Sequence, residues 1–167
     1  MDCEFRQLRE DEFDAAYKVV CNDVAWMLSK GITQWPRPIP EKVYRRRHAT
    51  GQNHGLFVGG ELAVVVTLMK NHRPAEWSDH LPEKSFTYLA TLASDPGHKG
   101  QGLGKLAVAK AEDLLRQQGQ TMIVLDCCCG VGFLPGYYQS LGYCPLHQMT
   151  IDYPTGAVKS VLMCKAL

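Results

Sequence analysis

The chain has 167 residues and a mass of 18.6 kDa, which fits one ordinary domain, and its 46% hydrophobic and 21% charged residues are typical of a globular protein. Eighteen Lys and Arg residues against seventeen Asp and Glu residues leave a net charge of +1, so no strong field exists to attract nucleic acid. The sharpest basic run, residues 45–48, indicates the solvated face of a short helix. We therefore expect one domain over residues 1–167 and no nucleic-acid partner.

Cysteine is the unusual feature of the composition, with seven residues. An odd number, three of them in a row at 127–129, does not resemble the framework of a disulfide-rich secreted protein. The N-terminus lacks the apolar segment of a signal peptide, and the longest apolar run, residues 62–69, is strand-length, far short of a membrane span. We therefore expect a soluble protein of the reducing cytoplasm, a monomer or homodimer without a membrane partner.

The cysteine run does not predict a metal site. Adjacent residues of a strand point to opposite faces, so residues 127–129 cannot easily converge on one ion, and the six histidines show no metal-ligand spacing. We interpret these cysteines as small buried residues and expect no bound metal.

Helix and strand signals alternate in the first half of the chain. Apolar residues at three- and four-residue spacing predict a helix that Asp11 could cap, and Gly59-Gly60 between two apolar runs predicts a hairpin. A loop with three prolines and Trp35 separates this helix from a second, shorter one. The expected elements are a short strand ending at residue 9, helices over residues 11–29 and 41–48, and strands over residues 56–58 and 61–69.

The second half centres on a strand, a glycine-rich loop, a helix and a further strand. Because a helix connects the two strands, they should pair in parallel. A polar loop, residues 71–84, precedes this unit. The expected elements are a strand over residues 85–93, a helix over 103–118, a strand over 121–127, a helix over 134–141, and closing strands near Met149 and Val161. Together they predict an α/β domain without a dividing linker.

Two functional interpretations of the glycine-rich segments do not fit the surrounding sequence. The segment 102–107 matches the dinucleotide fingerprint G-x-G-x-x-A, with Asp126 at about the expected distance, but residues 94–101 separate it from its strand. The segment 124–132 resembles the first motif of S-adenosylmethionine-dependent methyltransferases, with Cys128 in place of the first glycine. Each motif normally opens a long sheet, and the chain ends at residue 167, too soon for either.

The third interpretation is a resemblance to motif A of the GNAT superfamily of N-acetyltransferases, an apolar strand followed by V-x-P-x-x-[QR]-x-x-G-x-[GA] and a helix. This chain offers Ser94-x-Pro96-x-x-Lys99-x-x-Gly102-x-Gly104. Backbone N–H groups at the start of a helix form a cradle for pyrophosphate, and glycines let phosphate oxygens reach those groups. A plain glycine-rich turn that caps a helix is the alternative.

The resemblance covers nearly the whole chain. Residues 138–143 are similar to the family's second signature, Y-x-x-x-G-[FY], and residues 31–35 resemble a segment of many bacterial members. Three positions depart from the pattern. Lys99 replaces Gln or Arg, Ser94 replaces Val, and Val131 stands where an asparagine is often found. The resemblance implies a mixed central sheet in the order β-α-α-β-β-β-α-β-α-β-β.

The resemblance also implies acetyl-CoA as the donor and a primary amine, of a small molecule or of a peptide, as the acceptor. Backbone groups of Leu92, Ala93 and Ser94 would pair with pantetheine, and one of their amides would serve as oxyanion donor. Tyr138 would act as general acid on the departing thiolate, whereas Tyr137 would point elsewhere on its helix; Tyr138 could alternatively be a packed aromatic. The expected phosphate cradle is Lys99, Gly100, Gln101, Gly102, Leu103, Gly104 and Lys105.

The sequence leaves four questions open. No general base can be named, because strand 86–93 holds no Asp, Glu or His. The candidates are the flanking Glu83 and Asp95, His98, and a water relayed through Thr87, Tyr88, Thr91 or backbone carbonyls. Trp35, with Trp26 and Tyr153, would line the acceptor side or simply pack, and Cys128 or Cys129 could be thiol-reactive. A non-catalytic acyl-CoA-binding sensor or interaction module on the same fold is the alternative function.

Overall fold

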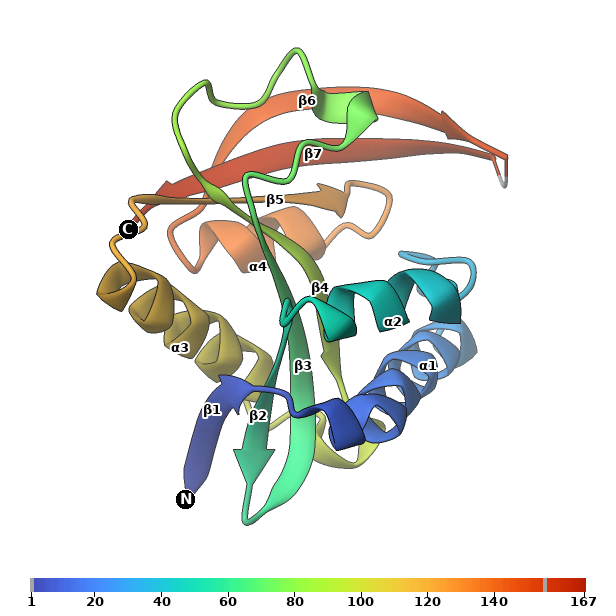
Figure 1. Ribbon diagram of the computed structural model, residues 1–167. Coiled ribbons are helices and arrows are strands. Elements are labelled where there is room, and N and C mark those ends of the chain that lie inside the picture. Colours follow the sequence, from blue (N-terminus) through green and yellow to red (C-terminus); the bar gives the residue numbers. More distant parts are fainter. Residues whose placement is uncertain (1, 155) are drawn as a thin grey trace.

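The computed structural model describes residues 2–154 and 156–167, which form a seven-stranded mixed sheet in the order β1-β2-β3-β4-β5-β7-β6, with helices on both faces (Figure 1). The strands are β1 (Cys3–Gln7), β2 (Asn53–Val58), β3 (Glu61–Lys70), β4 (Thr87–Ser94), β5 (Met122–Cys128), β6 (Cys144–Tyr153) and β7 (Gly156–Ala166). The helices are α1 (Phe13–Ser29), α2 (Glu41–Ala49), α3 (Leu103–Gln117) and α4 (Leu134–Gln139). This succession confirms the predicted α/β fold. Among these residues, no helix combines the length and apolarity of a bilayer span.

Two local expectations differ from the structure. Asp11 does not cap α1 but lies in a short 3₁₀ turn, Glu10–Glu12, that precedes the helix. Glu12 holds this turn, because its carboxylate accepts hydrogen bonds from the Arg9 backbone N–H at 2.7 Å and from the Arg6 guanidinium at 2.7 Å. Strands β6 and β7 are also longer than predicted, because β6 is exposed along most of its length and shows no clear apolar alternation.

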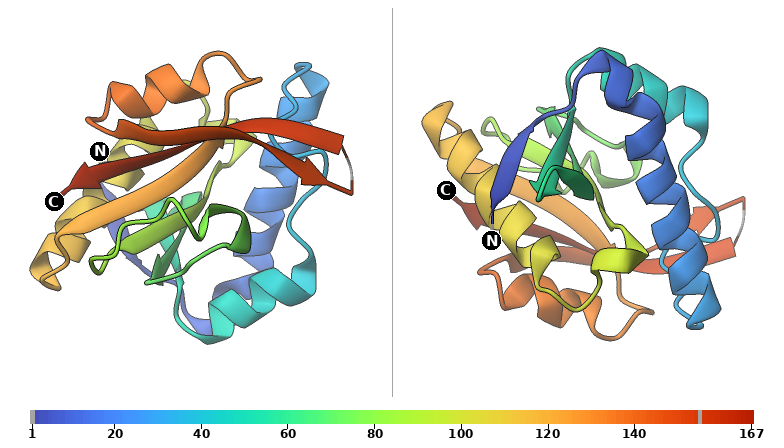
Figure 2. Two further views of the ribbon diagram at one scale, coloured as in Figure 1. Left: turned by 90° about the horizontal axis from the view of Figure 1, so that it is seen from above. Right: turned by 90° about the horizontal axis from the view of Figure 1, so that it is seen from below.

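The helices divide between the two faces of the sheet. α3 and α4 cover one face, where Ala107, Ala111 and Leu134 join a core with Val64 and Leu125. α1 and α2 cover the other face of the β1–β4 half, and Figure 2 shows α1 (blue) and α3 (yellow) on opposite sides of it. The loop between β3 and β4 covers the remaining part of that face, with Trp77 and Phe86 fully buried against β5 and β7.

The sheet opens between β4 and β5. These strands pair in parallel, as predicted, but only through Thr87 with Ile123 and Tyr88 with Val124. A β-bulge in the β3–β4 pairing falls at Ala90, after which β4 continues along β3 as far as Ser94. β5 stays paired with β7 over its whole length. The carboxyl halves of the two central strands therefore separate, and the cavities described below lie at this opening.

The packing around β2 yields a stability prediction. A Cβ added at Gly55 would stand 2.6 Å from Leu62 Cδ1 and 2.7 Å from Leu8 Cδ2, both in the core between β1, β2 and β3. Gly55→Ala is therefore expected to lower the free energy of unfolding by about 1–3 kcal/mol through overpacking, measured by urea denaturation. Gly132→Ala is the matched control, because a Cβ there meets no atom within 4 Å. Equal stability of the two variants would contradict this account of the β2 packing.

Candidate functional site

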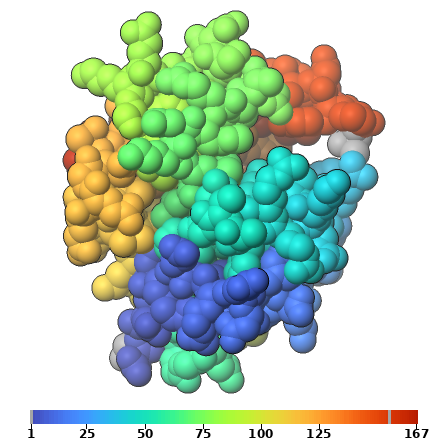
Figure 3. Space-filling view, in the orientation of Figure 1, coloured from blue at the N-terminus to red at the C-terminus, as the bar shows by residue number. Residues whose placement is uncertain are grey.

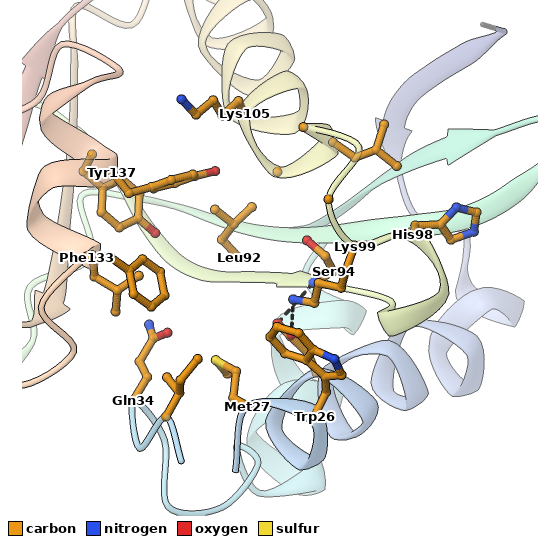
Figure 4. Close-up of a pocket in the computed structure, with 18 residues that line it drawn as sticks. Trp26, Met27, Gln34, Leu92, Ser94, His98, Lys99, Lys105, Phe133 and Tyr137 are labelled. Atoms are coloured by element: carbon orange, nitrogen blue, oxygen red, sulfur yellow. Dashed lines mark hydrogen bonds and ion pairs between the residues drawn. The ribbon is translucent and has the colours of Figure 1, made fainter. Parts of the chain in front are cut away.

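A first cavity of about 310 Å³ lies between α1, the loop that leads into α3, and α4 (Figure 4). Asp95 begins the loop and accepts a hydrogen bond from the Gly97 N–H at 2.9 Å. Gly100 and Gly102 have φ values of +79° and +74°, a left-handed conformation that residues with a Cβ rarely adopt. These two turns bring the start of α3 to the cavity wall.

Most of the predicted cofactor residues line this first cavity, and two do not. Ala93 is fully buried against α1 on the other face of the sheet, and Gln101 is exposed without lining the cavity. The predicted residues that line it are Leu92, Ser94, Lys99, Gly100, Gly102, Leu103, Gly104 and Lys105.

The backbone at the start of α3 offers unpaired donors. Within residues 2–154 and 156–167, no acceptor takes a hydrogen bond from the N–H groups of residues 100–105, and the first intrahelical bond runs from Leu106 N–H to Gly102 C=O. The dipole of α3 adds positive potential at the same end. The cavity wall therefore presents a concave set of N–H donors suited to an anion.

The two lysines beside these donors have different partners. The ammonium of Lys99 pairs with the Asp23 carboxylate at 2.5 Å and lies 4.7 Å from the centre of the Trp26 ring (Figure 4). Asp23, on α1, is 3% exposed, and its second oxygen accepts the Ser94 N–H at 3.1 Å. Lys105 has no carboxylate partner among the described residues and makes one 3.4 Å contact with Ser140 Oγ. Lys105 is thus the cation available to a ligand.

Two tyrosines of α4 face the first cavity. The expectation that Tyr137 points elsewhere is wrong, because both Tyr137 and Tyr138 line the cavity, with perpendicular rings 5.1 Å apart. The Tyr137 hydroxyl comes within 2.9 Å of the point where a Cβ on Gly104 would stand. Burial raises the pKa of Tyr137 to about 12, and it raises the pKa of Tyr138 further. Both phenols therefore hold their protons at neutral pH.

A second cavity, of about 390 Å³, lies on the other side of the opening between β4 and β5. The proline-rich loop and the β6–β7 hairpin form its walls, and Figure 3 shows a hollow between this hairpin (red) and the segment around α2 (cyan). Trp35 and Tyr153 line it, whereas Trp26 lines the first cavity. Gln34 lines both cavities, so they meet beside that residue.

Asp126 is a candidate functional residue that the sequence indicated only through the rejected dinucleotide fingerprint. It stands near the carboxyl end of β5, lines the second cavity, and accepts a hydrogen bond from the Tyr88 hydroxyl at 2.5 Å. Burial raises the pKa of Asp126 and the nearby Glu76 charge adds to this effect, while the Tyr88 hydrogen bond opposes it. An acidic residue at a strand end was the available signal, but only the separation of β4 from β5 gives it a cavity to face.

Of the residues considered as a general base, one lines the second cavity and the others lie outside it. Thr91 lines the second cavity, and Tyr88 reaches it only through its bond to Asp126. His98 lines the first cavity, 3.7 Å from Glu61. Neither Glu83 nor Asp95 lines either cavity.

The basic run 45–48 divides between solvent and interior, so its interpretation as a uniformly solvated face is wrong. Arg45 and Arg46 are exposed, but His48 is buried and bonds the Arg9 carbonyl at 2.9 Å. Arg47 is half-buried and lines the second cavity. Burial lowers the pKa of Arg47, although a guanidinium stays charged at any physiological pH.

The cysteine run lies at the end of β5. Cys127 and Cys128 line the second cavity, and burial raises the pKa of Cys127 to about 12 and also raises that of Cys129. The Cys127 thiol therefore stays protonated at neutral pH. No three His, Cys, Asp or Glu side chains of the described segments are grouped as metal ligands.

Comparison with known proteins agrees with this geometry. The chain is 30% identical over 126 residues to YesJ, an uncharacterized N-acetyltransferase of Bacillus subtilis, covering 71% of this chain and 68% of that one. A GNAT-family acetyltransferase of Listeria monocytogenes superposes with a TM-score of 0.77 at 20% identity, over 99% of this chain and 95% of that one. The PaiA N-acetyltransferase of Thermoplasma acidophilum, solved with coenzyme A, superposes with a TM-score of 0.65 at 15% identity over 100% of both chains.

The match to a family model is more direct evidence than these superpositions, because structural likeness at such low identity shows the fold alone. Residues 8–143 match the model of the acetyltransferase (GNAT) family. That range runs from the end of β1 to the segment after α4, and so contains the glycine-rich loop, the opened strands and both tyrosines. The chain belongs to the GNAT family of acetyltransferases.

Proposed function

We propose that this acetyltransferase transfers the acetyl group of acetyl-CoA to a primary amine, by direct attack in a ternary complex. The observation that carries the proposal is the pair of cavities that meet beside Gln34 at the opening between β4 and β5. One cavity offers anion-binding amides and the other offers the partly buried carboxylate of Asp126. A donor and an acceptor can therefore approach the same point from opposite sides, which lowers the entropic part of the barrier.

The start of α3 is the expected site of the CoA pyrophosphate. The N–H groups of residues 100–105 have no protein acceptor in the described ranges, and Lys105 supplies a nearby positive charge. Lys99 instead pairs with Asp23, which also takes the Ser94 amide, so we assign Lys99 a positioning role at the end of β4. The Ser94 amide is thereby less suited than its neighbours to act as an oxyanion donor.

The pantetheine arm would follow the open edge of β4. The edge of β4 that faces β5 has no strand partner after Tyr88, so an extended amide-containing arm can pair with it as an added strand does. Leu92 lines the first cavity on this edge, whereas the side chain of Ala93 faces α1 and leaves only its backbone for such a contact.

The reaction requires proton transfers at both ends. The acceptor ammonium gives one proton to a base, its nitrogen then bonds to the thioester carbonyl carbon, and the C–S bond breaks as the nitrogen releases its second proton to solvent. We assign Tyr138 to protonate the departing thiolate, because its phenol lines the first cavity and keeps its proton; solvent then restores that proton. Acetyl-CoA and the ammonium thus become the amide, CoA thiol and one proton.

A non-catalytic acyl-CoA-binding module would use the first cavity alone. The second cavity with Asp126, and the protonated Tyr138, favour an enzyme. Isothermal titration with acetyl-CoA, followed by a thiol-release assay over a panel of amines, separates the two functions. Binding with turnover of at least one amine is expected. Binding without turnover would favour the module, and absence of binding would contradict both.

The glycine loop allows a matched test of the phosphate cradle. Gly102 and Gly119 lie just before and just after α3 with φ values of +74° and +73°, and a Cβ on either would meet no atom within 4 Å. Alanine at each site costs about 1–2 kcal/mol of backbone strain. Only Gly102→Ala also places a methyl group among the anion-binding amides, so its Kd for acetyl-CoA should rise about ten-fold or more in isothermal titration. An equal rise in Gly119→Ala would argue against the cradle.

The two tyrosines of α4 allow a matched test of the general acid. Tyr138→Phe is expected to lower kcat about 100-fold or more, because the thiolate then leaves without a proton donor. Tyr137→Phe removes the neighbouring hydroxyl of the same cavity and should lower kcat much less. Because the Tyr138 phenol stays protonated, wild-type kcat should not fall between about pH 7 and 9. A loss in Tyr137→Phe as large as that in Tyr138→Phe would overturn the assignment.

A further inference from the structure

Resting on the proposed function, we propose that the second cavity binds an acceptor that carries an ammonium group and a carboxylate on one small molecule, an α-amino acid or a close analogue. Asp126 receives the ammonium group and Arg47 receives the carboxylate. This assignment names the acceptor class and supplies the base that the sequence leaves open.

Arg47 is a cation without a partner. Its guanidinium is half-buried on the wall of the second cavity, and across residues 2–154 and 156–167 it forms neither an ion pair nor a hydrogen bond. Its neighbours on α2 differ, because Arg45 pairs with Glu41 at 2.6 Å and Arg46 is exposed. A partly desolvated guanidinium favours binding of a carboxylate or another planar anion, which can accept hydrogen bonds from two of its parallel N–H groups.

Asp126 is the complementary anion in the same cavity. Its Oδ1 accepts the Tyr88 hydroxyl, which leaves hydrogen-bonding capacity on a carboxylate that keeps a partly exposed surface. The other polar or charged groups that interact with it are Trp77, Glu76, Tyr153, Tyr138 and Cys127, and none of them is a cation. An ammonium group from outside is therefore the partner that this carboxylate lacks, and the carboxylate can accept its proton before attack.

Arg47 and Asp126 lie on the same side of the sheet without neutralising each other. Burial is the main cause of the lowered pKa of His72, and the charge of Arg47 lowers it further. The His72 ring packs edge-on against Tyr88, with ring centroids 5.6 Å apart. Tyr88 in turn bonds Asp126. The two charged groups nevertheless form no ion pair with each other among the described contacts, so a zwitterionic ligand satisfies both at once.

The size and walls of the cavity favour a small molecule. A volume of about 390 Å³ is at the lower end of the range for small-molecule sites. Trp35 and Tyr153 supply apolar and aromatic surface for a side chain, while Ala90 and Thr91 of β4 form the wall next to the first cavity. A protein N-terminus would present an ammonium group without a nearby free carboxylate, and would leave Arg47 unpaired.

The test compares free amino acids with their carboxamides, which differ only at the group assigned to Arg47. The wild-type enzyme should acetylate the best free L-amino acid with a kcat/KM about 10- to 100-fold above that of its carboxamide, the range for a charge-assisted hydrogen bond. Arg47→Gln should abolish this preference, and Arg47→Lys should keep part of it. Arg46→Gln is the control, from the exposed neighbour on α2, and should keep the full preference. Circular dichroism checks that each variant folds.

Binding measurements keep this test distinct from that of the proposed function. Isothermal titration of the protein–CoA complex with the same free amino acids and carboxamides reports the preference even if no amine is turned over. Asp126→Asn should lower kcat for acids and carboxamides alike, because it removes the base rather than the carboxylate contact. Equal wild-type binding of acids and carboxamides, no binding of either, turnover of peptide N-termini alone, or equal loss in Arg46→Gln would each overturn the proposal.

Discussion

Strands β4 and β5 separate after two residue pairs, and the two cavities described above depend on that separation. Pairing joins Tyr88 to Val124, and the bulge at Ala90 then directs β4 along β3 while β5 follows β7. Backbone N–H and C=O groups on the facing edges are left without sheet partners, and such groups are costly to bury unless something pairs with them. An extended ligand with amide groups can satisfy them, so the same opening that weakens the sheet creates the place where a donor can lie.

A single buried carboxylate links this opening to the anion cradle. Asp23, on α1, accepts the Ser94 amide at the end of β4 and the Lys99 ammonium five residues later in the loop. Because each of its oxygens has a charged or N–H partner, its burial is tolerated, whereas removing the Lys99 ammonium would leave an uncompensated buried charge. The strand end and the start of the loop are thereby held to the same helix, beside residues 100–105, whose N–H groups have no protein acceptor in the described ranges.

Some of the site could be predicted from the sequence because its chemistry is local. Gly100 and Gly102 mark a left-handed backbone conformation, and Tyr138, which lines the first cavity, belongs to a motif of residues close together in the sequence. The side chain of Ala93 faces away from the first cavity, since alternate residues of a strand face opposite sides of the sheet, so the predicted pantetheine contact at Ala93 could use its backbone only.

Arg47 and Asp126 could not be predicted, because their setting is tertiary. Nothing within the uniformly basic run 45–48 distinguishes the arginine that packing turns inward, and Asp126 faces a cavity only where two strands part. The electrostatics of the second cavity show how this setting changes the pKa of Asp126. The folded pKa of Asp126 lies above its ordinary value of 3.8, so the stability contributed by its protonated form is lost as pH rises from that value through the folded pKa. Burial therefore makes the ionised form of this carboxylate costly in the folded protein. The burial that imposes this cost makes the carboxylate a better proton acceptor, and an ammonium group that enters the cavity offsets the cost while supplying the proton.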